Sequence, residues 1–486
     1  MKVLKNSIIY LVAVAVQGLA IFFLIPIYTR YLTPEEYGIF AVTNSLISFF
    51  TIFYSFSLPN TVLRLYFDYR DEEKRKEFFG TVFILALGIS TFLTIALLLT
   101  GKILTPLLLP GISFYPYIVL ALFSIAFSIS YLIFQSIIQA QQKAKLYGII
   151  NIAYVLTNIL LTTIFITVFQ LKVVGILLAL VVTNLIFFLY TISQIFPRMK
   201  FVIKKEIVAE VFMYSIPLIS NSVFAWATLF INKLLLNNLK TTAAAGIYDI
   251  GFYFGSIIAV FPSAINQAYV PWFYEKMKDS PREKVQIIKF AHASVLLYGF
   301  IALGLSLFGK EILSVLVGRA FKEAWQVVPF ITFSYVLSGI YNFFVIILLY
   351  SKNHVKYVPL ATVLSAVTNI AFNVLLIPRY GIIGSAFATL IAHIVTNIVV
   401  TILSLRIENI AYNWKRMYFI TGIFFIFSLL NFTSGLIEYK YLLTLKIILV
   451  ILTSAVIYSH YKSDIIHLKL SLYSVFNSKA KNKNDK

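Results

Sequence analysis

Apolar segments of about 20 residues recur from one end of this chain to the other, and no other feature constrains its fold as strongly. A helix of that length crosses the ~30 Å hydrocarbon core of a bilayer. The backbone must satisfy its own polar groups there, so these segments indicate membrane-spanning helices. The sequence therefore predicts an all-α polytopic membrane protein. We count fourteen segments, at 7–29, 38–60, 78–100, 116–137, 147–169, 174–195, 207–231, 245–270, 287–308, 327–350, 357–377, 381–405, 417–433 and 441–458.

Composition agrees with this class and excludes several others. The 486 residues are 60% hydrophobic and 12% charged, with a mean hydropathy of +0.90. No connection between segments exceeds about 20 residues, which leaves no room for a soluble domain. The chain has no cysteine, which excludes disulfides, thiolate catalysis and Cys-ligated metals.

The net charge of +21 is better explained by membrane orientation than by nucleic-acid binding. An even number of spans puts both termini on one side. If that side is the cytoplasm, 28 of the 40 Lys and Arg lie inside and 10 outside, which predicts cytoplasmic termini in the cell membrane. The apolar stretch from Ile8 to Tyr28 is too long for a signal peptide, so we interpret it as an uncleaved first span. Lys446 lies near the outer end of the last span, and we expect it to snorkel to the interface.

Two pairs of segments repeat at almost the same offset. The stretch "YGIFAVTNSLISFF" from residue 37 resembles "AGIYDIGFYFGSII" from residue 245, with Gly38 opposite Gly246. The stretch "AYVLTNILLTTIF" from residue 153 resembles "LSAVTNIAFNVLL" from residue 364, with Asn158 opposite Asn369. Spans 1–6 thus repeat as spans 7–12 in the same orientation, which is a transporter architecture.

The stretches "IYTRYLTPEEYGIFAV" from residue 27 and "NIAFNVLLIPRYGIIGSAFAT" (369–389) resemble the polysaccharide flippase family. These are the O-antigen and teichuronic-acid type transporters of the multidrug/oligosaccharidyl-lipid/polysaccharide exporter superfamily. The resemblance implies a flippase that carries polyprenyl-diphosphate-linked oligosaccharide from the cytoplasmic to the outer leaflet, for cell-surface polysaccharide synthesis. It also implies two six-helix bundles in a V shape around a cationic cavity, and partners among polysaccharide polymerases and glycosyltransferases.

The expected organisation follows from the repeat and the resemblance together. Residues 1–200 are predicted to form the N-terminal six-helix bundle and 201–405 the C-terminal one. Residues 406–460 are predicted to hold accessory helices 13 and 14, and 461–486 to form a basic cytoplasmic tail.

Fixed cations are needed to carry a diphosphate through hydrocarbon, and intramembrane charges are usually functional. Arg30 and Lys233 close spans 1 and 7, and Arg64 lies at the inner end of span 2 after Pro59. We predict that these three bases bind the diphosphate at different stages; the alternative is interfacial snorkelling or loop ion pairs. The family often has an acidic–basic pair near Lys233, whereas this chain has Asn232 there.

Asp249 is the clearest membrane-embedded acid. Three interpretations stay open: it binds H⁺ or Na⁺ and couples transport, it pairs with Lys233, or it is a first-turn acid favoured by the helix dipole. No cofactor or metal site is expected. Membrane-embedded asparagines either contact sugar hydroxyls or, more often, bond between helices. They are Asn44, Asn60, Asn158, Asn266, Asn369 and Asn373.

The stretch "TPEE" between spans 1 and 2 is predicted to start a helix. Thr33 is the expected N-cap, Pro34 the first helical residue and Glu36 the capping-box partner. Arg30 then either faces the cavity or pairs with Glu35 at its rim.

Other functions stay open. A multidrug exporter or a peptidoglycan-precursor flippase of the same superfamily fits the same architecture. A membrane polysaccharide polymerase fits less well, because the longest outer loop, 309–326, carries only Glu311 and Glu323 as acids. We therefore expect no enzyme.

Overall fold

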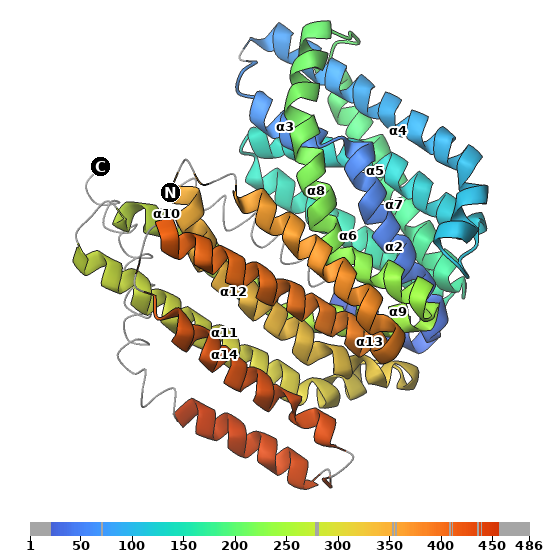
Figure 1. The fold of residues 1–486 in the computed structure, drawn as a ribbon. Helices are drawn as coiled ribbons and strands as arrows, with labels where there is room; N and C mark the ends of the chain where they lie inside the picture. The colour runs from blue at the N-terminus through green and yellow to red at the C-terminus, as the bar shows by residue number, and fades with distance from the viewer. Residues whose placement is uncertain are drawn as a thin grey trace. The chain divides into compact units, whose positions relative to one another are not determined.

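The computed structural model describes residues 21–69, 71–277, 281–351, 354, 357–407, 410, 412–434, 437–438 and 440–455. Most of the first predicted span and the basic tail 461–486 lie outside the described residues. Helices make up nearly all of the described chain, and none of its residues lies in a strand, as the predicted all-α class requires (Figure 1).

The chain divides into two compact units. The first ends at Asp249 and includes Leu316–Phe321; the second holds the remaining residues. The first contains the helix Ile21–Tyr31, α2 (Pro34–Ser55), α3 (Leu58–Leu65), α4 (Glu72–Leu108), η1 (Phe114–Ile118), α5 (Val119–Ala140), α6 (Ala144–Thr167), α7 (Lys172–Ile195), η2 (Phe196–Arg198), α8 (Lys205–Leu239) and the start of α9 (Thr242–Ser256). The second contains η3 (Ile257–Ala259), α10 (Val260–Lys276), α11 (Pro281–Leu316), η4 (Arg319–Val327), α12 (Val328–Tyr350), α13 (Tyr357–Ile407), α14 (Trp414–Ser428), η5 (Leu429–Thr433) and a helix at 440–455.

Eleven helical segments in the described residues are long and apolar enough to cross a membrane. Predicted spans 2–13 map onto these segments. Spans 11 and 12 both lie in α13, and only parts of spans 1 and 14 are described. Side chains such as Phe92, Leu99 and Leu107 on α4 are 69 to 75% exposed. Rows of large apolar side chains on a helix surface are expected where the surrounding solvent is lipid.

The 51 residues of α13 form a hairpin of two antiparallel arms (Figure 1). Asn369 Nδ2 donates to Thr389 Oγ1 at 3.3 Å, and Ser385 Oγ donates to Asn373 Oδ1 at 2.7 Å. Both pairs are centred on residue 379, so the chain must reverse there. Gly381 makes the turn at φ 55° and ψ −128°, a conformation that only glycine adopts without strain. The hairpin explains why one continuous helical run holds two predicted spans.

The second predicted span is broken just before Pro59. α2 ends at Ser55, Phe56 and Ser57 have positive φ angles of 47° and 54°, and α3 starts again at Leu58 with Pro59 in its first turn. Proline is tolerated in a first turn because the N–H it lacks has no partner there.

The segment between η2 and α8 is fastened to α4. A Cβ atom on Gly80 would lie 1.7 Å from the carbonyl oxygen of Lys200, so only glycine allows this approach. Thr81 Oγ1 donates to the Val202 carbonyl at 2.9 Å and accepts from the Lys204 N–H at 3.2 Å. α8 therefore starts from a fixed point on the first unit. The bundle boundary predicted at residue 200 follows the internal repeat, whereas the division at Asp249 follows packing.

Candidate functional site

The first helical turn of α2 is built as the "TPEE" stretch predicts. The Glu36 N–H donates to Thr33 Oγ1 at 3.2 Å, and the Thr33 N–H donates to Glu36 Oε2 at 2.9 Å. This reciprocal capping box, with Pro34 in the first turn, fixes where α2 begins. Glu36 also accepts from Lys172 Nζ at 2.7 Å, which ties the start of α2 to α7. The start of α2 in turn sets the positions of Tyr37 and Gly38.

The start of α2 packs on the start of α9 at backbone distance. A Cβ atom on Gly38 would lie 1.9 Å from the carbonyl oxygen of Thr242. A Cβ atom on Gly246 would lie 2.4 Å from the carbonyl oxygen of Pro34. We call these four residues the glycine crossing. It explains why the two repeats share a glycine at this position.

Lys233 and Asp249 form a buried ion pair beside this crossing. Their side chains are 0% and 1% exposed, and Lys233 Nζ bonds to Asp249 Oδ1. The hydroxyl of Tyr37 donates to the other carboxylate oxygen, Oδ2, at 3.0 Å. Lys233 Nζ also lies 5.2 Å from the ring centre of Phe230. Removing two charges from water costs several kcal/mol per ion, which only a close pair with further hydrogen bonds offsets.

Of the three interpretations of Asp249, the structure realises the pairing with Lys233. α8 supplies the base, α9 the acid and α2 the phenol. Tyr37 was not a predicted site residue. No local signal in the sequence points to it, because its partner Asp249 lies 212 residues away in the chain.

Arg30 lies at the end of the helix Ile21–Tyr31 and is exposed. Among the described residues it makes no ion pair, and Glu35 is likewise exposed without one. Of the two adjacent glutamates, only Glu36 forms the capping box and the ion pair with Lys172 described above.

Arg64 is also exposed, and it pairs with Asp68 at 2.9 Å one turn further along the chain. Their side chains are 55% and 46% exposed, so the pair contributes little to stability. The 22 residues of α2 separate Arg30 from Arg64, a rise of about 33 Å. The structure brings Lys233 and Asp249 together but places Arg30 and Arg64 at opposite ends of α2.

Glu210, near the start of α8, is held by a residue of the connection between α3 and α4. The Tyr69 hydroxyl donates to Glu210 Oε2 at 2.5 Å, and its ring stacks on Phe78 at 4.6 Å between ring centres. Burial and the neighbouring carboxylate raise the pKa of the Tyr69 hydroxyl, so it stays protonated and remains a donor.

Lys446 does not snorkel, so that expectation is wrong. Its side chain is 0% exposed, and its Nζ bonds to Glu311 Oε1 at 2.6 Å. The pair fixes the helix at 440–455 to the end of α11, because an amine this well enclosed requires a carboxylate partner.

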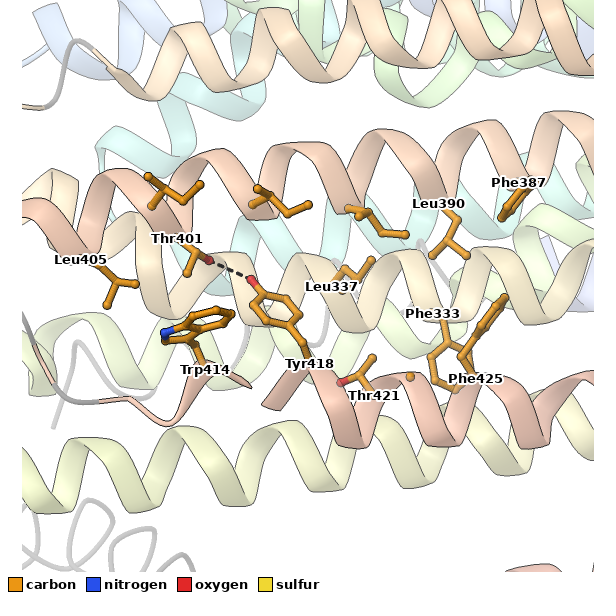
Figure 2. A pocket seen from close by; sticks show the side chains of 14 residues that line it. Phe333, Leu337, Phe387, Leu390, Thr401, Leu405, Trp414, Tyr418, Thr421 and Phe425 are labelled. Carbon is orange, nitrogen blue, oxygen red and sulfur yellow. Dashed lines mark hydrogen bonds between the residues drawn. The ribbon is translucent and has the colours of Figure 1, made fainter. Parts of the chain in front are cut away.

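An apolar cavity of about 510 Å³ lies among α12, the second arm of α13 and α14 (Figure 2). Phe333, Leu390, Trp414 and Phe425 are among the side chains that line it. Its polar groups are few; the Thr401 and Tyr418 hydroxyls bond to each other at 2.8 Å. Such a lining suits a hydrocarbon chain and offers nothing to a charged group.

Within the described residues, no three His, Cys, Asp or Glu side chains gather as a metal site would require.

The chain resembles known proteins in sequence and in fold. A family described as polysaccharide biosynthesis protein matches residues 3–277. A protein of the Lsg locus of Haemophilus influenzae is 26% identical over 399 residues, which cover 79% of this chain and 96% of the relative.

Two solved structures share the fold at low sequence identity. The lipid II flippase MurJ in an inward closed conformation superposes with a TM-score of 0.75 at 15% identity, over 95% of this chain and all of that one. An inward-facing multidrug resistance transporter of the MATE family gives 0.59 at 14% identity, over 82% and 96% of the two chains. These likenesses establish a membrane transporter fold. The family match covers more than half of the sequence, and the chain is therefore a multi-pass membrane protein that belongs to the polysaccharide biosynthesis protein family.

Proposed function

We propose that this protein moves a polyprenyl-diphosphate-linked oligosaccharide from the cytoplasmic to the outer leaflet of the cell membrane by alternating access. The family match over residues 3–277 carries this proposal. It is supported by the fold, which follows a lipid II flippase more closely than a multidrug transporter, with TM-scores of 0.75 and 0.59. In this proposal both termini are cytoplasmic, and polymerases and glycosyltransferases act on either side of the transport step.

In this proposal, the diphosphate binds arginine side chains at both membrane faces. Arg64 and Arg30 are exposed near the two ends of α2. Their forked guanidinium groups suit a diphosphate, and Arg64 must exchange Asp68 for it. Lys233 contributes only when Asp249 releases it.

That release gives Asp249 a coupling role. A proton or Na⁺ that neutralises the Asp249 carboxylate leaves Lys233 with an unbalanced charge, which a substrate phosphate then balances. The tail of the carrier needs an apolar path, and the cavity lined by Phe333, Trp414 and Phe425 supports such a path.

The test is a flipping assay in proteoliposomes. A fluorescent polyprenyl-diphosphate oligosaccharide is incorporated, and its appearance in the opposite leaflet is followed with a membrane-impermeant lectin. We expect protein-dependent flipping that falls at least tenfold in a variant carrying Arg30→Gln and Arg64→Gln, two exposed positions where the substitution should leave the fold intact. Full flipping by that variant would exclude the two arginines from the mechanism. Absence of flipping by the unmodified protein would remove the function.

A peptidoglycan-precursor flippase is the second candidate, and the likeness to the lipid II flippase favours it. Both substrates carry a polyprenyl diphosphate and differ in the headgroup. Flipping of lipid II in place of the oligosaccharide, in the same vesicles, would decide for this candidate.

A further inference from the structure

We infer that a cavity with a mixed polar and apolar lining inside the first unit binds one uncharged sugar residue of the transported headgroup. This inference rests on the proposed function and identifies the part of the headgroup that the first unit contacts. The cavity measures about 200 Å³ and lies among the helix Ile21–Tyr31, α2, α6 and α7. Tyr28, Phe40, Asn44, Tyr154 and Asn158 supply its polar and aromatic groups, and the rest of its lining is aliphatic.

The lining suits a neutral ligand with hydroxyl groups. No lysine, arginine, aspartate or glutamate lines the cavity, so a phosphate or a metal ion finds no opposite charge there. Carboxamides both donate and accept hydrogen bonds, as sugar hydroxyls require. Tyr28 and Phe40 also line the cavity, with ring planes tilted by 53°, and the edges of aromatic rings offer apolar contacts to the C–H groups of a sugar ring.

The side chains of Asn44 and Asn158 have hydrogen-bonding groups that no described residue uses. The Asn44 side chain makes no hydrogen bond with any described residue, and the Asn158 Oδ1 accepts none from them. Asn158 Nδ2 reaches Thr183 Oγ1 only at 3.5 Å, the outer limit for a hydrogen bond. Both side chains are half-buried, so their free amide atoms are available to water or to a ligand in the cavity.

The second repeat supplies an internal comparison. Asn369 corresponds to Asn158, and it is 0% exposed and bonded to both Thr389 and Asn373. The same residue type on the equivalent helix is therefore enclosed in one half of the chain and left facing a cavity in the other.

The cavity has the right size for one ring. A cavity of roughly 150 Å³ already holds a benzene-sized molecule. At about 200 Å³ this cavity is larger, and its two carboxamides give a hydroxylated ring hydrogen-bond partners that an apolar ring cannot use.

The absence of cysteine allows a direct test. Asn44→Cys and Asn158→Cys each place one thiol in the cavity of an otherwise cysteine-free protein. We expect a small neutral methanethiosulfonate reagent to label both in the purified full chain. Free hexoses or N-acetylhexosamines should slow that labelling at least threefold, while inorganic diphosphate should not. Asn369→Cys is the matched control, and its enclosed thiol should react slowly with or without sugar.

Labelling that no sugar in the panel slows means that the cavity holds only water, and this overturns the inference. A second measurement uses Asn44→Leu with Asn158→Leu, which keeps the side-chain volume. We expect this variant to fold and to flip the lipid-linked oligosaccharide about tenfold more slowly. Normal flipping by this variant also overturns the inference while leaving the proposed function intact. Sugar protection without flipping by the unmodified protein would instead reject the proposed function and leave the sugar site standing.

Discussion

At the residue scale, the pair of Lys233 and Asp249 carries a large desolvation cost, because both charges are buried. Their side chains are 0% and 1% exposed, and Tyr37 is the third member of the cluster. Well-packed apolar residues of similar volume are often as stable as a buried ion pair, or more so. We propose that a charge pair is kept at such a place because one of its charges changes during transport.

Replacing Lys233 with Met should strongly destabilise the protein, because Asp249 is then buried without its cation. Breaking a buried pair costs about 3–5 kcal/mol. The measurement is the thermal unfolding midpoint in detergent. Lys233→Met combined with Asp249→Leu should recover most of the loss, since no charge then remains. Equal midpoints for the single variant and the unmodified protein would show that the pair is not formed.

Arg64→Gln should change the free energy of unfolding by less than about 1 kcal/mol, because the pair with Asp68 is exposed. Flipping should nevertheless fall if Arg64 contacts the diphosphate. Both are measured on one preparation, with Lys76→Gln as the control for loss of a surface cation. A large loss of stability would contradict the exposed geometry, and full flipping would remove Arg64 from the route.

Sequence alone predicted Lys233 and Asp249 as candidates because charges inside apolar segments stand out. It did not predict Tyr37, because an aromatic side chain in an apolar helix is usually packing and its partner lies 212 residues away. It also could not rank Arg30 and Arg64 below the buried pair, since exposure depends on neighbours distant in the chain.

At the element scale, a short signal predicted the start of α2. The capping box at Thr33 and Glu36 follows from local chemistry that the sequence carries, and the reversal near residue 379 from the separation of spans 11 and 12. The left-handed residues Phe56 and Ser57 and the two cavities do not. They arise where several helices pack, and no local pattern records that packing.

Gly38→Ala should weaken the glycine crossing, because the added Cβ would stand 1.9 Å from the Thr242 carbonyl oxygen. We expect a lower unfolding midpoint and slower flipping. Gly88→Ala is the matched control, since a Cβ there meets nothing within 4 Å and alanine favours a helix by up to about 1 kcal/mol. A Gly38→Ala variant as stable as Gly88→Ala would mean that α2 and α9 are not in backbone contact.

At the scale of the whole molecule, the apolar segments and the basic residues determined most of what could be predicted. They indicated the all-α class and the places of spans 2 to 13. The division into two units at Asp249 was not predictable, because it depends on how α8 and the start of α9 pack rather than on where the repeat begins.

Predicted orientation can be tested across one helix. α6 has 24 residues, so its ends lie about 36 Å apart. In the cysteine-free chain, Phe169→Cys should react with a membrane-impermeant maleimide on intact cells. Lys145→Cys should react only after the cells are permeabilised. The reverse pattern would place the termini outside.

The glycine crossing has one further consequence. Gly38 meets Thr242 and Gly246 meets Pro34, and each residue lies 208 positions from its counterpart. The glycine of each repeat thus contacts, in the other repeat, the residue four positions before the glycine. Two identical subunits related by a two-fold axis make paired contacts of this kind, which are called isologous. One chain thus contains an interface of the kind that two identical subunits form. Substitutions at Gly38 and Gly246 should therefore couple rather than add, because both open the same contact.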